Sequence, residues 1–158
     1  MTAKAVEKRA RELFYSGFRC AESVLQAVAE QAGIQSPLIP KISTGFCGGI
    51  SRTKGVCGAV SGGVMALGMI LGRTSAEAPV DDIYGKVQKF LSAFENQHGS
   101  NNCFDLTGCD FNLAVDIQRW KESGIANKCM ELTGAAARMV TEIIDGDPAS
   151  QIKSTLLR

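Results

Sequence analysis

Apolar residues recur at intervals of three and four along most of this 158-residue chain. Such spacing places the apolar side chains on one face of an α-helix. Alternation of apolar and polar residues, which is typical of a half-buried β-strand, is missing from the sequence. The pattern therefore predicts an all-α fold. At this length we expect a single domain over residues 1–158, built as a bundle of about five to six helices.

Glycines, prolines and acidic residues indicate where the helices begin and end. The first helix is expected to stop at Gly17, the second at Gly33, the third to run from Cys57 to Gly72, the fourth from Asp81 to His98, and the fifth from Ile125 to Ile144. Between and after them we expect a short helical segment opened by Ser36-Pro37, a glycine loop at 45–49, short turns within 100–123, and a short amphipathic tail after Pro148.

The stretch from Val56 to Gly72 is apolar and carries no charge. Its 17 residues fall short of the roughly 20 that a membrane-spanning helix needs, so we expect no membrane insertion here. Gly58, Gly62 and Ala66 share one edge of the expected helix, where their small size allows neighbouring backbones to approach closely. The sequence therefore predicts a buried Gly/Ala-rich helix at the centre of the bundle.

The distribution of charge excludes some classes of partner. The net charge is +1 and Lys and Arg are spread along the chain, which argues against nucleic acid or an anionic membrane as the partner. Residues 1–10 are charged and lack an apolar core, so we expect no secretory signal and a cytoplasmic location. In that compartment the six cysteines should stay reduced, as thiols or as metal ligands.

Three of the cysteines fall at the starts of expected helices. Cys20, Cys57 and Cys129 lie in or near the first turn of the second, third and fifth helices, each on the apolar face. Cys103 follows an Asn-Asn pair that can cap another short turn. The partial positive charge of a helix N-terminus favours the thiolate, which binds soft metals and attacks disulfides. We therefore expect these side chains to point inward from separate helices, with lowered pKa values.

A purely structural role is the alternative for the same cysteines. Free cysteine is often buried as a small hydrophobic residue. The chain would then be a non-catalytic helical interaction module, whose small-residue edges pair with other helices. No C-x-x-C pair occurs, so neither a thioredoxin-type motif nor a zinc ribbon is expected. Any cysteine site must be assembled by the fold from residues that are far apart in the sequence.

The segments around these cysteines resemble a family of redox-active proteins named for its C_GCAxxG_C_C signature. The matching elements, between about residues 10 and 140, are Cys20-Ala21, Gly45-x-x-Gly-Gly-Ile-x-Arg52, Cys57-Gly-Ala-Val-Ser-Gly62, Cys103 and Cys129. Members are small bacterial and archaeal proteins with four shared cysteines, which by position correspond to Cys20, Cys57, Cys103 and Cys129. Cys47 and Cys109 are additional to that set. The resemblance implies a redox activity but does not identify a substrate.

Placement and resemblance together predict a redox centre made of Cys20, Cys57, Cys103 and Cys129. In one form these four thiolates bind a soft metal ion or an iron–sulfur cluster and exchange electrons with an unidentified donor or acceptor protein. In the other form two cysteines cycle between dithiol and disulfide, as in an oxidoreductase or a redox sensor. The first form is favoured, because four inward thiolates make a cage more readily than an exposed exchange pair. The sequence does not determine the oligomeric state, and a homodimer is one possible assembly.

The remaining candidates are assigned structural roles. The glycines between Gly45 and Arg52 are expected to form a sharp turn that allows close packing, in preference to a nest for an anion. His98, the sole histidine, is expected to cap its helix, and Trp120 to serve packing. The acidic residues fall on outward helix faces, without a convergent carboxylate pair.

Overall fold

The computed structural model describes residues 1–147, so the predicted amphipathic tail lies outside the described residues. Those residues form eight α-helices and one 3₁₀ helix, η1, with no β-strand among them. The helices are α1 (Ala3–Tyr15), α2 (Cys20–Gln31), η1 (Lys41–Phe46), α3 (Cys47–Arg52), α4 (Gly58–Leu71), α5 (Asp81–His98), α6 (Cys103–Thr107), α7 (Ala114–Glu122) and α8 (Ile125–Asp145). The predicted all-α class is confirmed.

The five long helices follow the bounds that their stop signals predict. α5, for example, begins at Asp81 and ends at His98, where Gly99 adopts the left-handed conformation (φ 92°) that commonly ends a helix. The ring of His98 packs on Phe94, with 4.6 Å between the ring centroids. The additional helices α3, α6 and α7 are short and lie where a loop and turns were expected.

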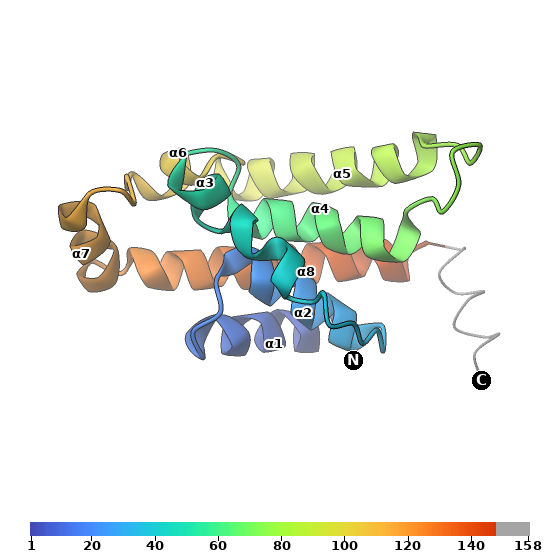
Figure 1. Ribbon diagram of the computed structural model, residues 1–158, viewed down its shortest axis with the longest axis horizontal. Coiled ribbons are helices and arrows are strands. Elements are labelled where there is room, and N and C mark those ends of the chain that lie inside the picture. Colours follow the sequence, from blue (N-terminus) through green and yellow to red (C-terminus); the bar gives the residue numbers. More distant parts are fainter. Residues whose placement is uncertain (148–158) are drawn as a thin grey trace.

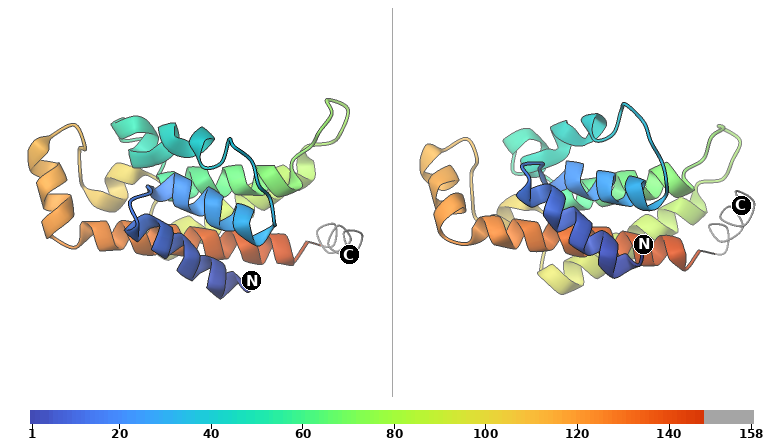
Figure 2. Two further views of the ribbon diagram at one scale, coloured as in Figure 1. Left: turned by 60° about the horizontal axis from the view of Figure 1, so that its bottom comes forward. Right: turned by 90° about the horizontal axis from the view of Figure 1, so that it is seen from below.

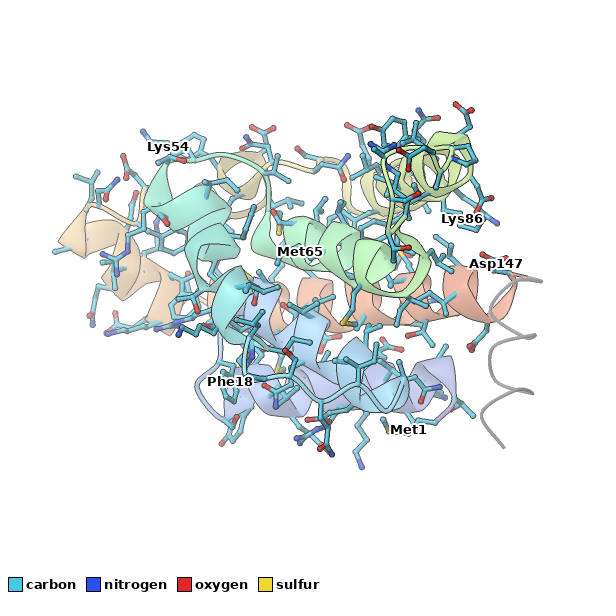
Figure 3. All side chains as sticks on the ribbon, turned by 45° about the vertical axis from the view of Figure 1, so that its right-hand side comes forward. Met1, Phe18, Lys54, Met65, Lys86 and Asp147 are labelled. Carbon is cyan, nitrogen blue, oxygen red and sulfur yellow. The ribbon has the colours of Figure 1, made fainter. Side chains whose placement is uncertain are left out.

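The long helices pack side by side into an elongated bundle (Figure 1). α8 runs along the bundle and contacts α1, α2, α4 and α5. The short helices α3, α6 and α7 gather at one end, as both further views also show (Figure 2). Lys54 lies at this end, whereas the ion pair between Lys86 and Asp147 (3.3 Å) lies at the other (Figure 3).

The predicted central helix is α4, which packs against α2, α5 and α8. Its first six residues, from Gly58 to Gly63, are all buried. A Cβ atom at Gly62 would lie 2.7 Å from the carbonyl oxygen of Ala21, and one at Gly63 would meet the ring of Phe90. Glycine is required at Gly62 because the backbones of α2 and α4 touch there, and at Gly63 because the Phe90 ring of α5 packs directly on α4.

Among residues 1–147, no helix combines the length and the apolar character that crossing a bilayer demands.

Candidate functional site

A cavity of about 550 Å³ opens at the end of the bundle where α3, α6 and α7 lie. Five cysteines line it, each at or near the start of a different helix: Cys20, Cys47, Cys57, Cys103 and Cys129. All are free thiols in the structure. The fold thus brings the four cysteines singled out in the sequence to one cavity, and it adds Cys47 to them.

The helix start at α2 stabilises a thiolate on Cys20. Hydrogen bonding from the neighbouring Cys47 thiol favours the Cys20 thiolate most, and the backbone N–H groups of Gly48, Ala21 and Cys20 itself act in the same direction. The Cys47 Sγ also lies 3.8 Å from the Ser43 carbonyl oxygen, a second acceptor for its proton. These donors outweigh the effect of burial and lower the pKa of Cys20 to about 7. The pKa of Cys47 moves the opposite way and is raised, because its proton is held by Cys20.

Gly58 allows this pair of sulfur side chains to form. A Cβ atom on Gly58 would overlap the Cys20 Sγ and would lie 3.2 Å from the Cα atom of Cys47. The same small volume is therefore bordered by both cysteines and by the start of α4. A side chain at residue 58 would therefore displace the Cys20 sulfur from its place beside Cys47.

The segment that carries Cys47 has an unusual backbone. Five consecutive residues have positive φ: Gly48 (66°), Gly49 (68°), Ile50 (57°), Ser51 (52°) and Arg52 (69°). This conformation is unfavourable for residues with a side chain, most of all for a β-branched one such as Ile50. Strained backbone of this kind is concentrated at functional sites.

Hydrogen bonds and close packing hold the strained turn in place. The Ser51 hydroxyl donates to the Gly45 carbonyl (2.8 Å), and the Gly55 N–H donates to the Gly49 carbonyl (2.9 Å). A Cβ atom at Gly49 would lie 2.6 Å from the Cβ of Cys103. The expected turn for close packing is thus present, and it seats α3 directly against α6.

A short antiparallel bridge fixes Cys57 and Cys103 beside each other. The Cys57 N–H donates to the Asn101 carbonyl (2.8 Å), and the Cys103 N–H donates to the Gly55 carbonyl (2.9 Å). Each side chain is only 7% exposed. Burial, followed by the nearby Cys20 thiolate, raises the pKa of Cys57 and raises that of Cys103 to about 12. Both cysteines therefore stay protonated at neutral pH, and the lowered pKa values expected from their positions at helix starts are wrong here because burial outweighs the helix N-terminus.

Cys129, on α8, faces the cavity beside Trp120 of α7. The indole N–H donates to the Cys129 Sγ at 3.4 Å, and the guanidinium of Arg19 lies 5.5 Å from the centroid of the Trp120 ring. Burial raises the pKa of Cys129 to about 11, although the indole donor acts in the opposite direction. Trp120 thus has a polar contact within the site in addition to the packing role expected of it.

The sixth cysteine, Cys109, does not line the cavity. It is 1% exposed, and its Sγ lies 3.5 Å from the Thr107 carbonyl oxygen and 3.8 Å from the Arg119 guanidinium. Its surroundings are those of a structural thiol.

The cysteines are the kind of donors that soft metals prefer, but their placement does not fit a single ion. Over the described part of the chain, no three Cys, His, Asp or Glu side chains are grouped closely enough to hold a metal ion. A zinc site needs four ligands, with sulfur at about 2.3 Å from the metal. The sulfurs here instead stand around the walls of a cavity.

Comparison with known proteins bears on this arrangement of cysteines. A family model described as "Putative redox-active protein (C_GCAxxG_C_C)" matches residues 18–143, which include all five cavity cysteines. The chain belongs to the C_GCAxxG_C_C family. An "Uncharacterized protein" of Archaeoglobus fulgidus is similar, at 29% identity over 140 residues that cover 83% of this chain and 92% of the relative. No solved structure matches.

Three side chains of the cavity were not assigned to a site from the C_GCAxxG_C_C signature. Cys47 stands where the signature has a small residue, and only its position next to Gly48 hinted at a close approach. Arg19 and Arg52 are exposed residues that also line the cavity. Arg52 belongs to the matched glycine-rich segment, so its place near Cys47 could have been expected from the sequence.

Proposed function

We propose that the protein is a dithiol–disulfide oxidoreductase in which Cys20 is the nucleophile and Cys47 the resolving cysteine. The observation that supports this proposal most is that Cys20 and Cys47 both line the cavity and border the same small volume at Gly58, where an added Cβ atom would overlap the Cys20 Sγ and lie 3.2 Å from the Cα atom of Cys47. A thiol with a pKa of about 7 is close to optimal for attacking a disulfide at neutral pH, because it combines a high thiolate fraction with high nucleophilicity. The proposed location is the cytoplasm, where dithiols are kept reduced.

The proposed reaction transfers two electrons from the protein to a disulfide substrate. The Cys20 thiolate attacks one substrate sulfur, so that the substrate S–S bond breaks, a mixed disulfide forms and the first substrate thiolate leaves. Cys47 loses its proton to solvent and attacks the Cys20 sulfur, which releases the second substrate thiolate. The products are two thiols and a Cys20–Cys47 disulfide, and a dithiol reductant restores the starting state.

The electrostatics of the pair support these two roles. The pKa of Cys47 is raised first by its hydrogen bond to Cys20 and also by burial and by the Cys20 negative charge. Formation of the mixed disulfide removes both the charge and the thiolate acceptor. The pKa of Cys47 should then fall towards its ordinary range, so that the second thiol becomes reactive only after the first has reacted.

An iron–sulfur cluster is a second candidate, favoured by the convergence of Cys20, Cys57, Cys103 and Cys129 on one cavity. In a 4Fe–4S cluster each cysteine binds a different iron atom, so the ligands need not meet at one point. The dithiol is preferred because Cys47 adds a fifth thiol to the cavity, next to Cys20 at the Gly58 position, where it would compete with a cluster for Cys20.

The interaction-module alternative receives less support from the packing. Its small-residue edge on α4 is used inside the bundle, since Gly58 borders Cys20 and Gly62 borders Ala21. Ala66 on the same edge is fully buried. This edge therefore has no exposed surface for a partner helix or for a second copy of the chain.

The test is to purify the protein anaerobically, measure iron, sulfide and zinc, and then oxidise it with one equivalent of diamide. Peptide mapping by mass spectrometry should find a Cys20–Cys47 disulfide. Cys47→Ala should prevent its formation, whereas Cys109→Ala, which removes a thiol outside the cavity, should not. Stoichiometric iron and acid-labile sulfide, or a disulfide that leaves Cys20 and Cys47 free, would overturn the proposal.

A further inference from the structure

Two arginines at the mouth of the cavity have no anionic partner. Among the arginines within residues 1–147, the guanidinium groups of Arg9, Arg11, Arg119 and Arg138 pair with carboxylates, and that of Arg73 binds backbone carbonyls. Arg19 and Arg52 are the exceptions, and both line the cavity. Arg19 is held over the Trp120 ring, which orients its charge without neutralising it.

The rest of the cavity lining reinforces this positive charge. Lys121 of α7 also lines the cavity, and no Asp or Glu is among the lining residues within 1–147. The nearest carboxylate along the chain from Cys20 is that of Glu22. It is engaged by the Arg19 backbone N–H (2.8 Å) and by the Thr44 hydroxyl (2.7 Å). Arg19, Arg52 and Lys121 thus place three positive charges on the cavity lining, and none of the three forms an ion pair within residues 1–147.

The walls of the cavity are suited to a small organic molecule. Its volume of about 550 Å³ lies in the range that is usual for small-ligand sites. Phe111 and Trp120 form one wall and meet edge to face, with ring centroids 6.1 Å apart. Phe14 adds a third aromatic side chain to the lining. An anionic group bound by the arginines would leave the remainder of the molecule between these rings and the Cys20 sulfur.

We propose that the substrate is a low-molecular-mass disulfide that carries carboxylate or phosphate groups. This inference rests on the thiol chemistry proposed above and names the substrate class for it. Arg19 and Arg52 bind the anionic groups and so place the substrate sulfur–sulfur bond beside Cys20. Cys20 breaks that bond and retains one half as a mixed disulfide, and Cys47 releases this half as a thiol. Each of the two leaving thiolates takes its proton from solvent.

The test compares three small disulfides of different charge in single-turnover reactions with the reduced protein. The probes are oxidised glutathione, which is anionic, hydroxyethyl disulfide, which is neutral, and cystamine, which is cationic. Formation of the Cys20–Cys47 disulfide is followed by quenching in acid and mass spectrometry. At low ionic strength we expect oxidised glutathione to react about tenfold or more faster than cystamine, with a difference that shrinks as salt is added.

Charge variants assign this preference to the cavity. Arg19→Gln and Arg52→Gln should each reduce the ratio of the two rate constants several-fold, and Arg52→Lys should largely keep it. Lys89→Gln removes the same charge from the exposed face of α5 and should leave the ratio unchanged. Thermal unfolding of each variant establishes that it is folded.

The failures of the two proposals are distinguishable. If cystamine and hydroxyethyl disulfide oxidise the Cys20–Cys47 pair as fast as oxidised glutathione does, the substrate class is wrong and the dithiol function stands. The substrate class is also wrong if the glutaminyl variants keep the full preference. If none of the three disulfides oxidises the pair while both thiols titrate as free, the proposed function itself is overturned.

Discussion

Gly58 lies against the sulfur of Cys20, at the point where α4 starts and where a side chain would overlap that sulfur. The contact joins two residues 38 positions apart and places the N-terminus of one helix beside that of another. The Gly58 position also borders the Cα atom of Cys47 at 3.2 Å. The two proposed reactive cysteines are therefore both packed against a residue that bears no chemistry of its own.

Gly58→Ala should impair both the stability and the reactivity of the protein. The added methyl group overlaps the Cys20 Sγ in a buried position, and such overpacking costs about 1–3 kcal/mol of unfolding free energy. Since the Cys20 sulfur must shift from the position in which backbone N–H groups and Cys47 lower its pKa, its reaction with iodoacetamide at pH 7 should also slow. Urea denaturation and alkylation kinetics measure the two effects.

Gly68→Ala in the same helix is the matched control. Gly68 is exposed, and a Cβ atom there meets nothing within 4 Å. Alanine should therefore stabilise α4 by up to about 1 kcal/mol and leave the alkylation rate of Cys20 unchanged. Equal stability and equal reactivity of the two variants would show that the Gly58–Cys20 contact has no role in the site.

The neighbouring glycines Gly48 and Gly49 allow the cost of strain to be separated from the cost of a clash. Both have positive φ, so alanine at either should cost about 1–2 kcal/mol. Only Gly49 also faces Cys103, whose Cβ a new methyl group would approach to 2.6 Å. Gly49→Ala should therefore destabilise the protein by about 1–3 kcal/mol more than Gly48→Ala in urea denaturation. A smaller effect at Gly49 would contradict the close seating of α3 on α6.

The long helices and the convergence of four cysteines could be anticipated from the sequence because both follow from helical periodicity. A stripe of apolar residues such as Val24 and Val28 fixes which face of α2 is buried, and the face then places Cys20 inward. The signature glycines indicate close approaches in the same way. Gly58 borders the Cys20 sulfur and Gly62 borders the Ala21 backbone, and these close approaches explain why glycine occupies both positions.

The role of Cys47 could not be obtained in this way. It depends on the left-handed turn that follows, and this turn includes Ile50 and Ser51, two residues whose intrinsic preference is against positive φ. Local propensity therefore points away from the conformation that the fold imposes. The polar contact of Trp120 with Cys129 is similarly a product of how α7 meets α8, and no spacing within either helix encodes it.

Trp120→Phe should make Cys129 less reactive towards alkylating reagents. The indole N–H lowers the pKa of Cys129, so its removal should raise that pKa above about 11 and reduce the thiolate fraction at any lower pH. A hydrogen bond of about 0.5–1.5 kcal/mol corresponds to a decrease in alkylation rate of about two- to tenfold. Mass spectrometry of the Cys129 peptide after timed alkylation at pH 9 measures this rate.

Phe111→Leu is the control for the loss of aromatic packing. Phe111 contacts the Trp120 ring edge to face but supplies no donor to Cys129. If this variant slows alkylation of Cys129 as much as Trp120→Phe does, the effect arises from packing and the indole N–H is not responsible.

The alkylation rate of Cys20 should follow a titration with a midpoint near pH 7, because only the thiolate reacts and the pKa of Cys20 is lowered to about 7. Cys57, Cys103 and Cys129 have raised pKa values, so they should react appreciably only in alkaline solution. Iodoacetamide kinetics between pH 5 and 9, resolved by peptide, distinguish Cys20 from the other thiols of the cavity.

Replacement of Cys47 tests what lowers the pKa of Cys20. The largest cause is the hydrogen bond that Cys47 donates to the thiolate, so Cys47→Ala should move the midpoint to higher pH. Cys47→Ser retains a hydroxyl donor and should move it less. Backbone N–H groups of Cys20, Ala21 and Gly48 remain in both variants, so the midpoint should stay below that of an ordinary thiol. A midpoint that is unchanged in Cys47→Ala would mean that the two cysteines do not act as a pair.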